Sequence, residues 1–182
     1  MESNIRELIA QCKKGQPKAQ QQFYAQCYKL VYNTCLRLLN HTAEAEDAMQ
    51  ETFIKVFEKL DQQNTEESNF FAWLKRIAIN TCLDKLRQKR MSLFPLDEKM
   101  AGLMSNPIVR EEDLTLKVQQ VKSAIMSLSD GYRVMLSLIL LEGFDYEEVS
   151  EVLKITPSAA RTQYSRGRQK LLAALSGKII NE

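Results

Sequence analysis

The chain has 182 residues and a net charge of +2, and hydrophobic residues make up 45% of it. This length suits one medium domain or two small ones, and the apolar fraction is enough to build a core. The longest apolar run, around residues 134–141, is far shorter than the ~20 residues that span a membrane. The first residues also lack the pattern of a secretion signal. We therefore expect a cytoplasmic protein with no direct membrane insertion.

The four cysteines, Cys12, Cys27, Cys35 and Cys82, form no CxxC pair, and the only histidine is His41. A structural zinc site needs about four nitrogen or sulfur ligands at short spacings. The sequence therefore predicts free, mostly buried thiols in a reducing compartment, with no metal and no other cofactor.

The first half of the chain has the apolar spacing of amphipathic helices. The predicted helices cover residues 5–12, 18–40, 42–60 and 69–88. Gly15 is placed to end the first of them. Thr42 can cap the third, whose acidic first turn suits the helix dipole. The polar run 61–68 is predicted to be a loop.

Composition changes after Arg90, where Pro95, Gly102 and Pro107 interrupt any helical period. A segment of about 20 residues of this kind is long for a loop inside one domain, so we predict a flexible linker. The predicted divisions are 1–90 for the N-terminal domain, 91–111 for the linker and 112–182 for the C-terminal domain. The expected fold is all-α, with two small helical domains and a helix-turn-helix in the second.

The second domain begins with a predicted apolar stripe over 114–128, after which Asp130 can cap the next helix. Asp145 and Glu148 have the spacing of a capping box, which predicts a short helix that ends at Leu153.

A basic helix follows a turn of three residues, 154–156. Thr156 can cap this helix, and Pro157 fits its first turn. Residues 154–178 contain six Lys or Arg and no acid. A solvated amphipathic tail is one interpretation of such charge. The short helix and tight turn in front of it favour a helix-turn-helix that binds duplex DNA.

One face of the basic helix, with Ala160, Tyr164, Gly167 and Leu171, is expected to pack on the preceding helix. The expected DNA contacts on its other side are Ser158, Arg161, Thr162, Ser165, Arg166, Arg168 and Lys170. The first of these are placed to reach base edges, and the last three to reach phosphates. Gly167 is expected to weaken the helix by up to ~1 kcal/mol relative to Ala.

Two further segments carry mixed chemistry. Residues 69–87 combine aromatics, bases and a mid-helix Asn80, a combination that suits either single-stranded nucleic acid or an ordinary core. Residues 43–53 are acidic and allow three interpretations: a metal or catalytic site, a protein contact, or a solvated helix start.

Three blocks, taken together, resemble the extracytoplasmic-function sigma factors, the two-domain subunits that give bacterial RNA polymerase its promoter specificity. The first is AEDAMQETFIKVF at 45–57, and the second is WLKRIAIN at 73–80, followed by Asp84 and Arg87. The third is the C-terminal helix-turn-helix. The resemblance covers about residues 17–90 and 112–176.

The resemblance implies core RNA polymerase and promoter DNA as partners, a separate anti-sigma factor, and neither catalysis nor a small-molecule substrate. The positions that match the polymerase-docking surface are Asp47, Gln50, Glu51 and Phe53. Those that match the single-strand contacts of the minus-ten element are Asn80, Lys75, Arg76, Arg87, Trp73 and Asn64. The basic helix corresponds to the reader of the minus-thirty-five element. The chain departs from the family pattern at Ser129, Lys154, Ala160 and Gly167.

Two other functions fit parts of the sequence. A helix-turn-helix repressor or activator would bind duplex DNA as a dimer without polymerase, although no heptad seam or ligand pocket is evident. A metal-dependent nuclease could use carboxylates at Glu46, Asp47 and Glu51.

Overall fold

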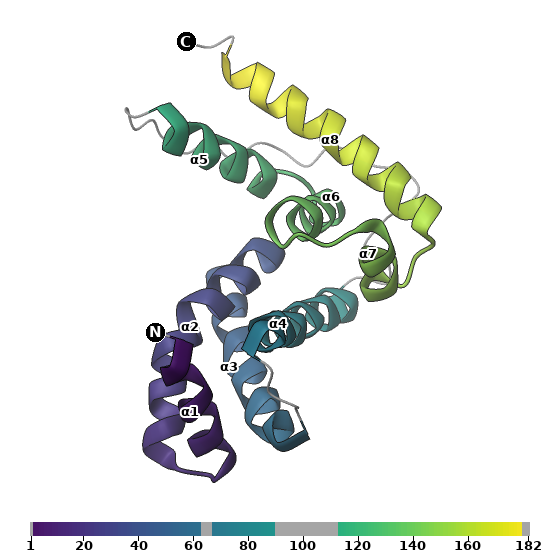
Figure 1. Ribbon diagram of the computed structural model, residues 1–182. Helices are drawn as coiled ribbons and strands as arrows, with labels where there is room; N and C mark the ends of the chain where they lie inside the picture. Colours follow the sequence, from purple (N-terminus) through teal and green to yellow (C-terminus); the bar gives the residue numbers. More distant parts are fainter. Residues whose placement is uncertain (1, 63–66, 90–112, 180–182) are drawn as a thin grey trace. The chain divides into compact units, whose positions relative to one another are not determined.

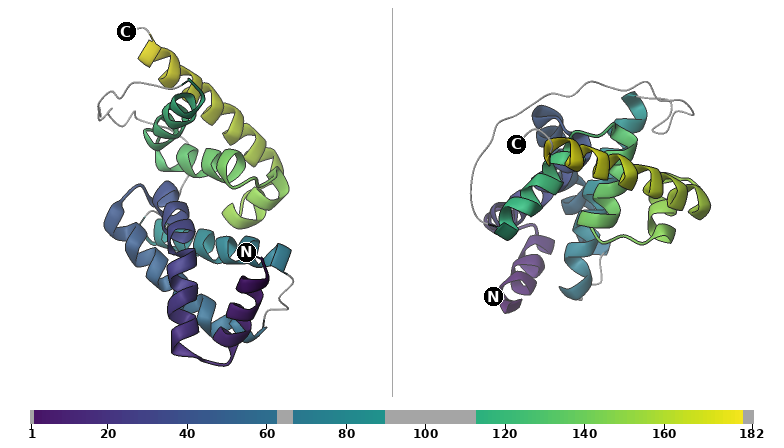
Figure 2. Two further views of the ribbon diagram at one scale, coloured as in Figure 1. Left: turned by 60° about the vertical axis from the view of Figure 1, so that its left-hand side comes forward. Right: turned by 90° about the horizontal axis from the view of Figure 1, so that it is seen from above.

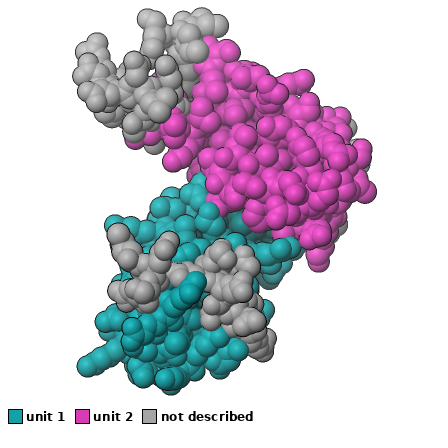
Figure 3. Space-filling view, viewed as in Figure 1, with its two compact units in different colours: residues 1–90 teal, residues 91–182 magenta. Residues whose placement is uncertain are grey.

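The computed structural model describes residues 2–62, 67–89 and 113–179 (Figure 1). Within these ranges the regular elements are all helices, so the all-α expectation is confirmed. The chain divides into two compact units, residues 1–90 and 91–182 (Figure 3). The predicted linker falls outside the described residues, so its boundaries stay a prediction.

The N-terminal unit is built from four α-helices and one short 3-10 turn. Their bounds are α1 Glu2–Lys13, α2 Pro17–Leu39, α3 Thr42–Lys59, η1 Leu60–Gln62 and α4 Glu67–Lys89. The long helix α2 packs against α1, α3 and α4, and α3 also packs against α4 (Figure 2). Each of these helices therefore has one face in a shared core.

Phe23 of α2 lies at the centre of this core and is completely buried. Its ring meets those of Phe53, Phe57 and Phe70 edge-on, with centroids 6.2, 5.8 and 5.7 Å away. Aromatic rings attract in this geometry because a positive ring edge faces a negative ring face. One side chain thus joins α2 to both α3 and α4.

An ionic cluster also ties α3 to α4. The Glu51 carboxylate lies 2.7 Å from Nζ of Lys55 and 3.5 Å from Nζ of Lys85 on α4. Lys55 also donates a hydrogen bond to Oγ1 of Thr81, at 3.2 Å. The hydrogen bond from Lys55 is the main cause that lowers the pKa of Glu51 below its ordinary value. Glu51 is therefore bound within the unit as well as partly exposed.

The helix ends in this unit agree with the sequence except at one cap and in the predicted loop 61–68, where η1 continues to Gln62 and α4 already begins at Glu67. Gly15, after α1, and Asn40, after α2, both adopt positive φ, as helix-terminating residues commonly do. The N-cap of α3 is His41 and not Thr42, which was the predicted cap. His41 has extended backbone angles, and its Nδ1 accepts a hydrogen bond from the N–H of Glu44 at 3.5 Å. A ring nitrogen takes the role expected of the hydroxyl, and Thr42 becomes the first helical residue.

All four cysteines are free and buried, as expected. Burial raises the pKa of Cys12, and it raises that of Cys27 to about 11. The pKa of Cys82 is also raised, first by a hydrogen bond with Cys35 and then by burial. Thiols held neutral in this way are unreactive core residues.

The C-terminal unit contains α5 Asp113–Met126, α6 Asp130–Leu136, the π-helical turn η2 Ser137–Leu141, α7 Tyr146–Leu153 and α8 Pro157–Ile179. Helix α8 packs against α5, α6 and α7. Buried Ala124 and Ile125 of α5, Leu136 of α6 and Leu171 of α8 form a hydrophobic cluster between these helices.

The N-cap of α6 is Ser129, so the prediction that Asp130 caps this helix was wrong. Asp130 is the first helical residue, and its Oδ1 accepts a hydrogen bond from Nη2 of Arg133 at 2.8 Å. That guanidinium is buried, so the carboxylate provides a charged partner where water is excluded.

Gly167 has a packing role that offsets its low helix propensity. A Cβ atom at this position would lie 3.2 Å from Cδ1 of Tyr132 and 3.4 Å from Cγ of Leu136. Both neighbours are buried side chains of α6. The missing side chain therefore lets α8 approach α6 closely.

We predict that Phe23→Ala lowers the free energy of unfolding of the N-terminal unit by about 3–5 kcal/mol, because it leaves a cavity among three rings. Urea unfolding followed by the fluorescence of Trp73, the only tryptophan, measures this unit selectively. The control is Ile54→Ala, which truncates an exposed side chain and is expected to change stability by less than about 0.5 kcal/mol. Equal effects of the two variants would contradict the central position of Phe23.

We also predict that the Glu51 carboxyl titrates below 4.5, the ordinary value for Glu, in an NMR titration of the side chain. A carboxyl whose pKa is lowered on folding stabilises the fold above its unfolded pKa, and this stabilisation disappears as the pH falls through the folded pKa. Lys55→Met is expected to raise the pKa of Glu51 toward 4.5. Lys59→Met, which alters an exposed lysine outside the cluster, is the control and leaves the titration unchanged. An unperturbed Glu51 in the wild type would rule out the cluster.

Candidate nucleic-acid and partner surfaces

The turn between α7 and α8 has the geometry of a tight helix-turn-helix connection. The predicted capping box at the start of α7 is confirmed: Oδ1 of Asp145 accepts from the N–H of Glu148 at 2.8 Å, and Oε2 of Glu148 accepts from the N–H of Asp145 at 3.0 Å. At the other end, the N–H of Ile155 donates to the carbonyl of Ser150 at 3.0 Å. Both ends of this short helix are therefore fixed by hydrogen bonds.

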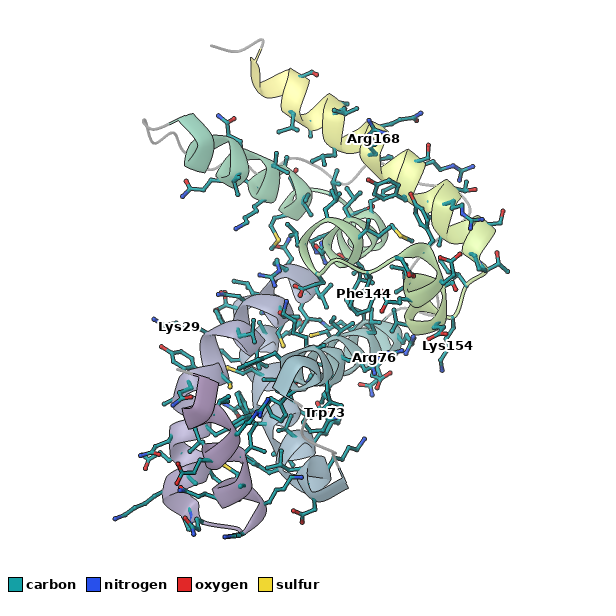
Figure 4. The ribbon with its side chains drawn as sticks, in the orientation of Figure 1. Lys29, Trp73, Arg76, Phe144, Lys154 and Arg168 are labelled. Atoms are coloured by element: carbon teal, nitrogen blue, oxygen red, sulfur yellow. The ribbon has the colours of Figure 1, made fainter. Side chains whose placement is uncertain are left out.

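Lys154 provides the change of direction between the two helices (Figure 4). Its backbone is left-handed, with φ 56° and ψ 46°. This conformation has a steric cost for lysine that glycine would avoid. The turn adopts it nevertheless.

Helix α8 begins as the sequence indicates and buries the predicted face. Oγ1 of Thr156 accepts a hydrogen bond from the N–H of Ala159 at 3.1 Å. Ala160, Gly167 and Leu171 are buried and Tyr164 is half-buried. The opposite side of the helix is left for solvent.

The side chains predicted to contact DNA on α8 are all exposed: Ser158, Arg161, Thr162, Ser165, Arg166, Arg168 and Lys170. Figure 4 labels Arg168 on this helix. Oγ1 of Thr162 donates to the carbonyl of Ser158 at 3.0 Å, and Nζ of Lys170 lies 5.2 Å from the centroid of the Tyr132 ring. The structure thus presents a basic, hydroxyl-bearing face behind a tight turn.

Arg161 has partners that the sequence did not indicate. Its Nη2 donates to Oε1 of Glu147 on α7 at 3.2 Å, and its guanidinium carbon lies 5.7 Å from the centroid of the Tyr146 ring. These residues are 14 and 15 positions earlier in the chain, and only the fold of the turn brings them together. No local spacing rule reports such a contact.

A second exposed stripe runs along α4. Helical spacing of three and four residues aligns Trp73, Arg76, Asn80, Asp84 and Arg87. Arg76, Asn80 and Asp84 are exposed, and Trp73 and Arg87 are half-buried. Arg87 donates to Asp84 at 2.9 Å, and the Trp73 ring lies 5.5 Å from that of Phe70. The stripe places an aromatic ring, an amide and two guanidinium groups on one side of one helix; Figure 4 labels Trp73 and Arg76 on it.

Two of the residues predicted for this site do not join the stripe. Lys75 lies two residues after Trp73, which puts it about 200° around the helix, on the other side of α4. The expected contact of Lys75 with a phosphate stays a prediction, made from a different side of the helix. Asn64, predicted to form part of the same site, lies outside the described residues.

A third exposed face lies on α3, where Asp47, Gln50 and Ile54 follow one another at helical spacing and Glu51 is half-buried beside them. Ile54 is 59% exposed. It was not among the predicted contact residues, although its spacing from Gln50 could have indicated it.

Phe53, which was predicted to contact a partner, is only 3% exposed. Its ring packs on Phe23 and lies 4.7 Å from that of Tyr24. Phe53 therefore supports the α3 face from beneath and is not available for direct contact.

The carboxylates considered for a nuclease are arranged differently from a metal site. Glu46 and Asp47 are exposed, while Glu51 faces two lysines. Among the described residues, no group of three His, Cys, Asp or Glu side chains is placed to hold a metal ion. Within the same residues, no helix combines the length and apolar character needed to cross a membrane.

Known proteins match both units. The model of sigma-70 region 2 matches residues 23–91, and that of sigma-70 region 4 matches residues 118–171. The ECF RNA polymerase sigma factor SigW of Bacillus subtilis is 31% identical over 182 residues, covering 94% of this chain and 96% of SigW. SigE of Mycolicibacterium smegmatis is 34% identical over 78% of this chain and 55% of SigE.

Solved structures show the same fold. The sigma factor RpoE of Bartonella quintana, crystallised with the anti-sigma factor NepR, has a TM-score of 0.57 and 24% identity, covering 86% of this chain and 96% of that one. CnrH, solved with the cytosolic domain of CnrY, has a TM-score of 0.55 and 24% identity, covering 94% and 97% of the two chains. The two region matches, and the 31% identity to SigW over nearly the full length of both chains, show that the chain belongs to the extracytoplasmic-function group of RNA polymerase sigma factors.

Proposed function

We propose that this sigma factor divides promoter recognition among three surfaces. The α3 face docks on core RNA polymerase, the α4 stripe holds the opened strand of the minus-ten element, and the exposed side of α8 reads the minus-thirty-five element. The observation that carries the proposal is the α4 stripe, because it combines stacking, base-edge and phosphate-binding groups on one exposed side of a helix.

The α3 face has the composition of a docking surface. Exposed Ile54 is an apolar centre, and Asp47 and Gln50 are polar groups at its rim. Interfaces commonly have this arrangement, in which the desolvated centre supplies affinity and the rim supplies specificity. Glu51 is bound to Lys55 and Lys85, so we assign it to holding α3 against α4 as well as to the rim.

The α4 stripe suits a single strand. The amide of Asn80 can donate to and accept from a base edge, and the half-buried ring of Trp73 offers a surface on which a base can stack. Arg76 and Arg87 are placed along the same line for phosphates. In this arrangement the opened DNA strand runs along the axis of α4.

The exposed face of α8 suits duplex DNA. Ser158, Arg161 and Thr162 lie in the first two turns, which enter the major groove when a helix of this class docks. Arg166 and Arg168 follow and are assigned to phosphates, whose contacts position a helix without reading sequence.

We also propose that the chain has no catalytic activity of its own and acts in the cytoplasm, where the polymerase makes the RNA. RpoE was solved with an anti-sigma factor, and CnrH with the cytosolic domain of CnrY. By similarity of fold, we propose that a separate anti-sigma protein binds this chain as well. Co-purification of such a protein with the chain from cells tests that assignment.

Ile54→Lys, which puts a charge at the centre of the face, and Asp47→Lys, which reverses a charge at its rim, are each predicted to weaken binding to core polymerase by about tenfold or more. Titration of labelled sigma factor into core polymerase, followed by fluorescence anisotropy, measures the affinity. Glu46→Lys is the matched control, since it makes the same charge change at the neighbouring exposed position, about 100° around the helix. Wild-type affinity in the Asp47 and Ile54 variants would exclude the α3 face.

Asn80→Ala is predicted to relax base preference at one position of the minus-ten element by about fivefold or more, because a base-edge contact is lost. Run-off transcription on a promoter library with that element randomised reports the preference at each position. Gln88→Ala, which removes an exposed amide two turns further along α4, is the control. Binding to core polymerase is expected to stay normal in both variants. An unchanged preference in Asn80→Ala would show that this amide does not read a base.

A further inference from the structure

Helix α7 holds Arg161 from two sides. Oε1 of Glu147 accepts a hydrogen bond from Nη2 of Arg161 at 3.2 Å, and the guanidinium lies 5.7 Å from the centroid of the Tyr146 ring. The Tyr146 ring is itself braced, because it meets the ring of Tyr164 on α8 edge-on at 5.7 Å. The guanidinium is therefore restrained by the helix that precedes the recognition helix.

This restraint leaves Arg161 able to bind. An arginine has five N–H donors, and the hydrogen bond to Glu147 uses one of them, on Nη2. A bidentate contact with a guanine needs only two donors. The side chain of Arg161 is also 58% exposed, so a second partner can reach it. Glu147 thus orients the group without covering it.

The restraint also matters for the choice between base and phosphate. An unrestrained arginine near a duplex has phosphate oxygens within reach on many rotamers, and phosphate contacts carry no sequence information. A carboxylate fixed beside the guanidinium reduces that freedom, and its negative charge opposes close approach to the phosphates. Glu148 cannot replace it in this role, because its own carboxylate accepts the N–H of Asp145 in the capping box.

We propose that Glu147 and Tyr146 are positioning residues that direct Arg161 to a base edge in the upstream promoter element. In this role they raise discrimination at one base pair and lower affinity for duplex DNA in general. The proposal rests on the assignment of α8 to that element. An exposed ion pair adds little to folding stability, so its effect appears in base preference and not in the stability of the unit.

The test uses holoenzyme reconstituted from core polymerase and the full chain. The DNA is a duplex promoter library in which the upstream element is randomised and the minus-ten element is fixed. Sequencing of the bound fraction gives the base preference at each position. Arg161→Ala identifies the position that Arg161 reads.

Glu147→Ala is expected to lower the preference at that same position by about two- to fivefold and to leave the other positions unchanged. Affinity for a duplex that lacks the element is expected to rise by about twofold, because one negative charge near the phosphates is removed. In an Arg161→Ala background, Glu147→Ala has no further effect on the preference.

Two conservative variants, Glu147→Gln and Tyr146→Phe, separate the contacts with Arg161 from the negative charge of Glu147. Glu147→Gln keeps an oxygen that can accept from the guanidinium, so it recovers part of the lost preference while its gain in non-specific affinity matches that of Glu147→Ala. Tyr146→Phe keeps the ring and the preference, whereas Tyr146→Ala lowers it. The circular dichroism melts of Glu147→Ala, Glu147→Gln and Tyr146→Phe are expected to lie within about one degree of the wild-type melt. Tyr146→Ala, which also loses the ring contact with Tyr164, is expected to melt lower.

The outcomes are distinct. If Arg161→Ala removes the base preference at a position but Glu147→Ala leaves that preference unchanged, the positioning role is overturned and the base contact of Arg161 stands. A uniform change at every position in Glu147→Ala assigns that residue to general repulsion only and also overturns the proposal. If Arg161→Ala changes the base preference at no position, Arg161 does not contact a base, and the positioning role is overturned as well.

Discussion

The packing of the Phe23 ring against Phe53, Phe57 and Phe70 is the interaction on which the N-terminal unit depends. Because these rings lie on α2, α3 and α4, a single buried contact region fixes the three helices together. Each of α3 and α4 uses one side for this core and presents another to the surroundings. The α3 face proposed for docking and the α4 stripe proposed for the opened strand are those outer sides, so their relative placement is set by the core.

The ionic cluster around Glu51 adds a second link between the same helices. Lys55 and Lys85 reach its carboxylate from α3 and α4, respectively, and Lys55 also bonds Thr81. A residue that matches the family's docking surface therefore also connects to the helix assigned to the opened strand. Under the proposed function, Glu51 serves the partner and the fold at the same time, and its contacts with Lys55 and Lys85 show the second of these roles.

The C-terminal unit meets a different requirement, which is to pack one face of α8 on its own core while the other face stays exposed for the proposed DNA contact. Gly167 lets α8 lie close to α6, and the left-handed backbone at Lys154 turns the chain sharply between α7 and α8. The close packing at Gly167 and the hydrogen-bonded ends of α7 maintain the geometry of the helix-turn-helix.

Much of this could be predicted from the sequence, and the exceptions have physical reasons. Helix spacing, the Asp145–Glu148 capping box and the buried face of α8 follow local rules, and the structure confirms them. The caps at His41 and Ser129 were missed because a hydroxyl or carboxylate one residue later looked equally suitable. The burial of Phe53 agrees with its place in an apolar stripe of helical spacing, and only the match to the family's docking surface indicated a contact there. The contact between Glu147 and Arg161 depends on tertiary packing, which local spacing does not report.

The central claim is that this chain enables core polymerase to open a promoter and hold the exposed strand. Permanganate reactivity of thymines in the minus-ten element measures strand opening directly, in parallel reactions that contain core polymerase alone or with the chain. The account predicts reactive thymines, and run-off transcripts from the same promoter, only when the chain is present. Equal reactivity with core polymerase alone, or a bound promoter that stays unreactive with the chain present, would contradict it.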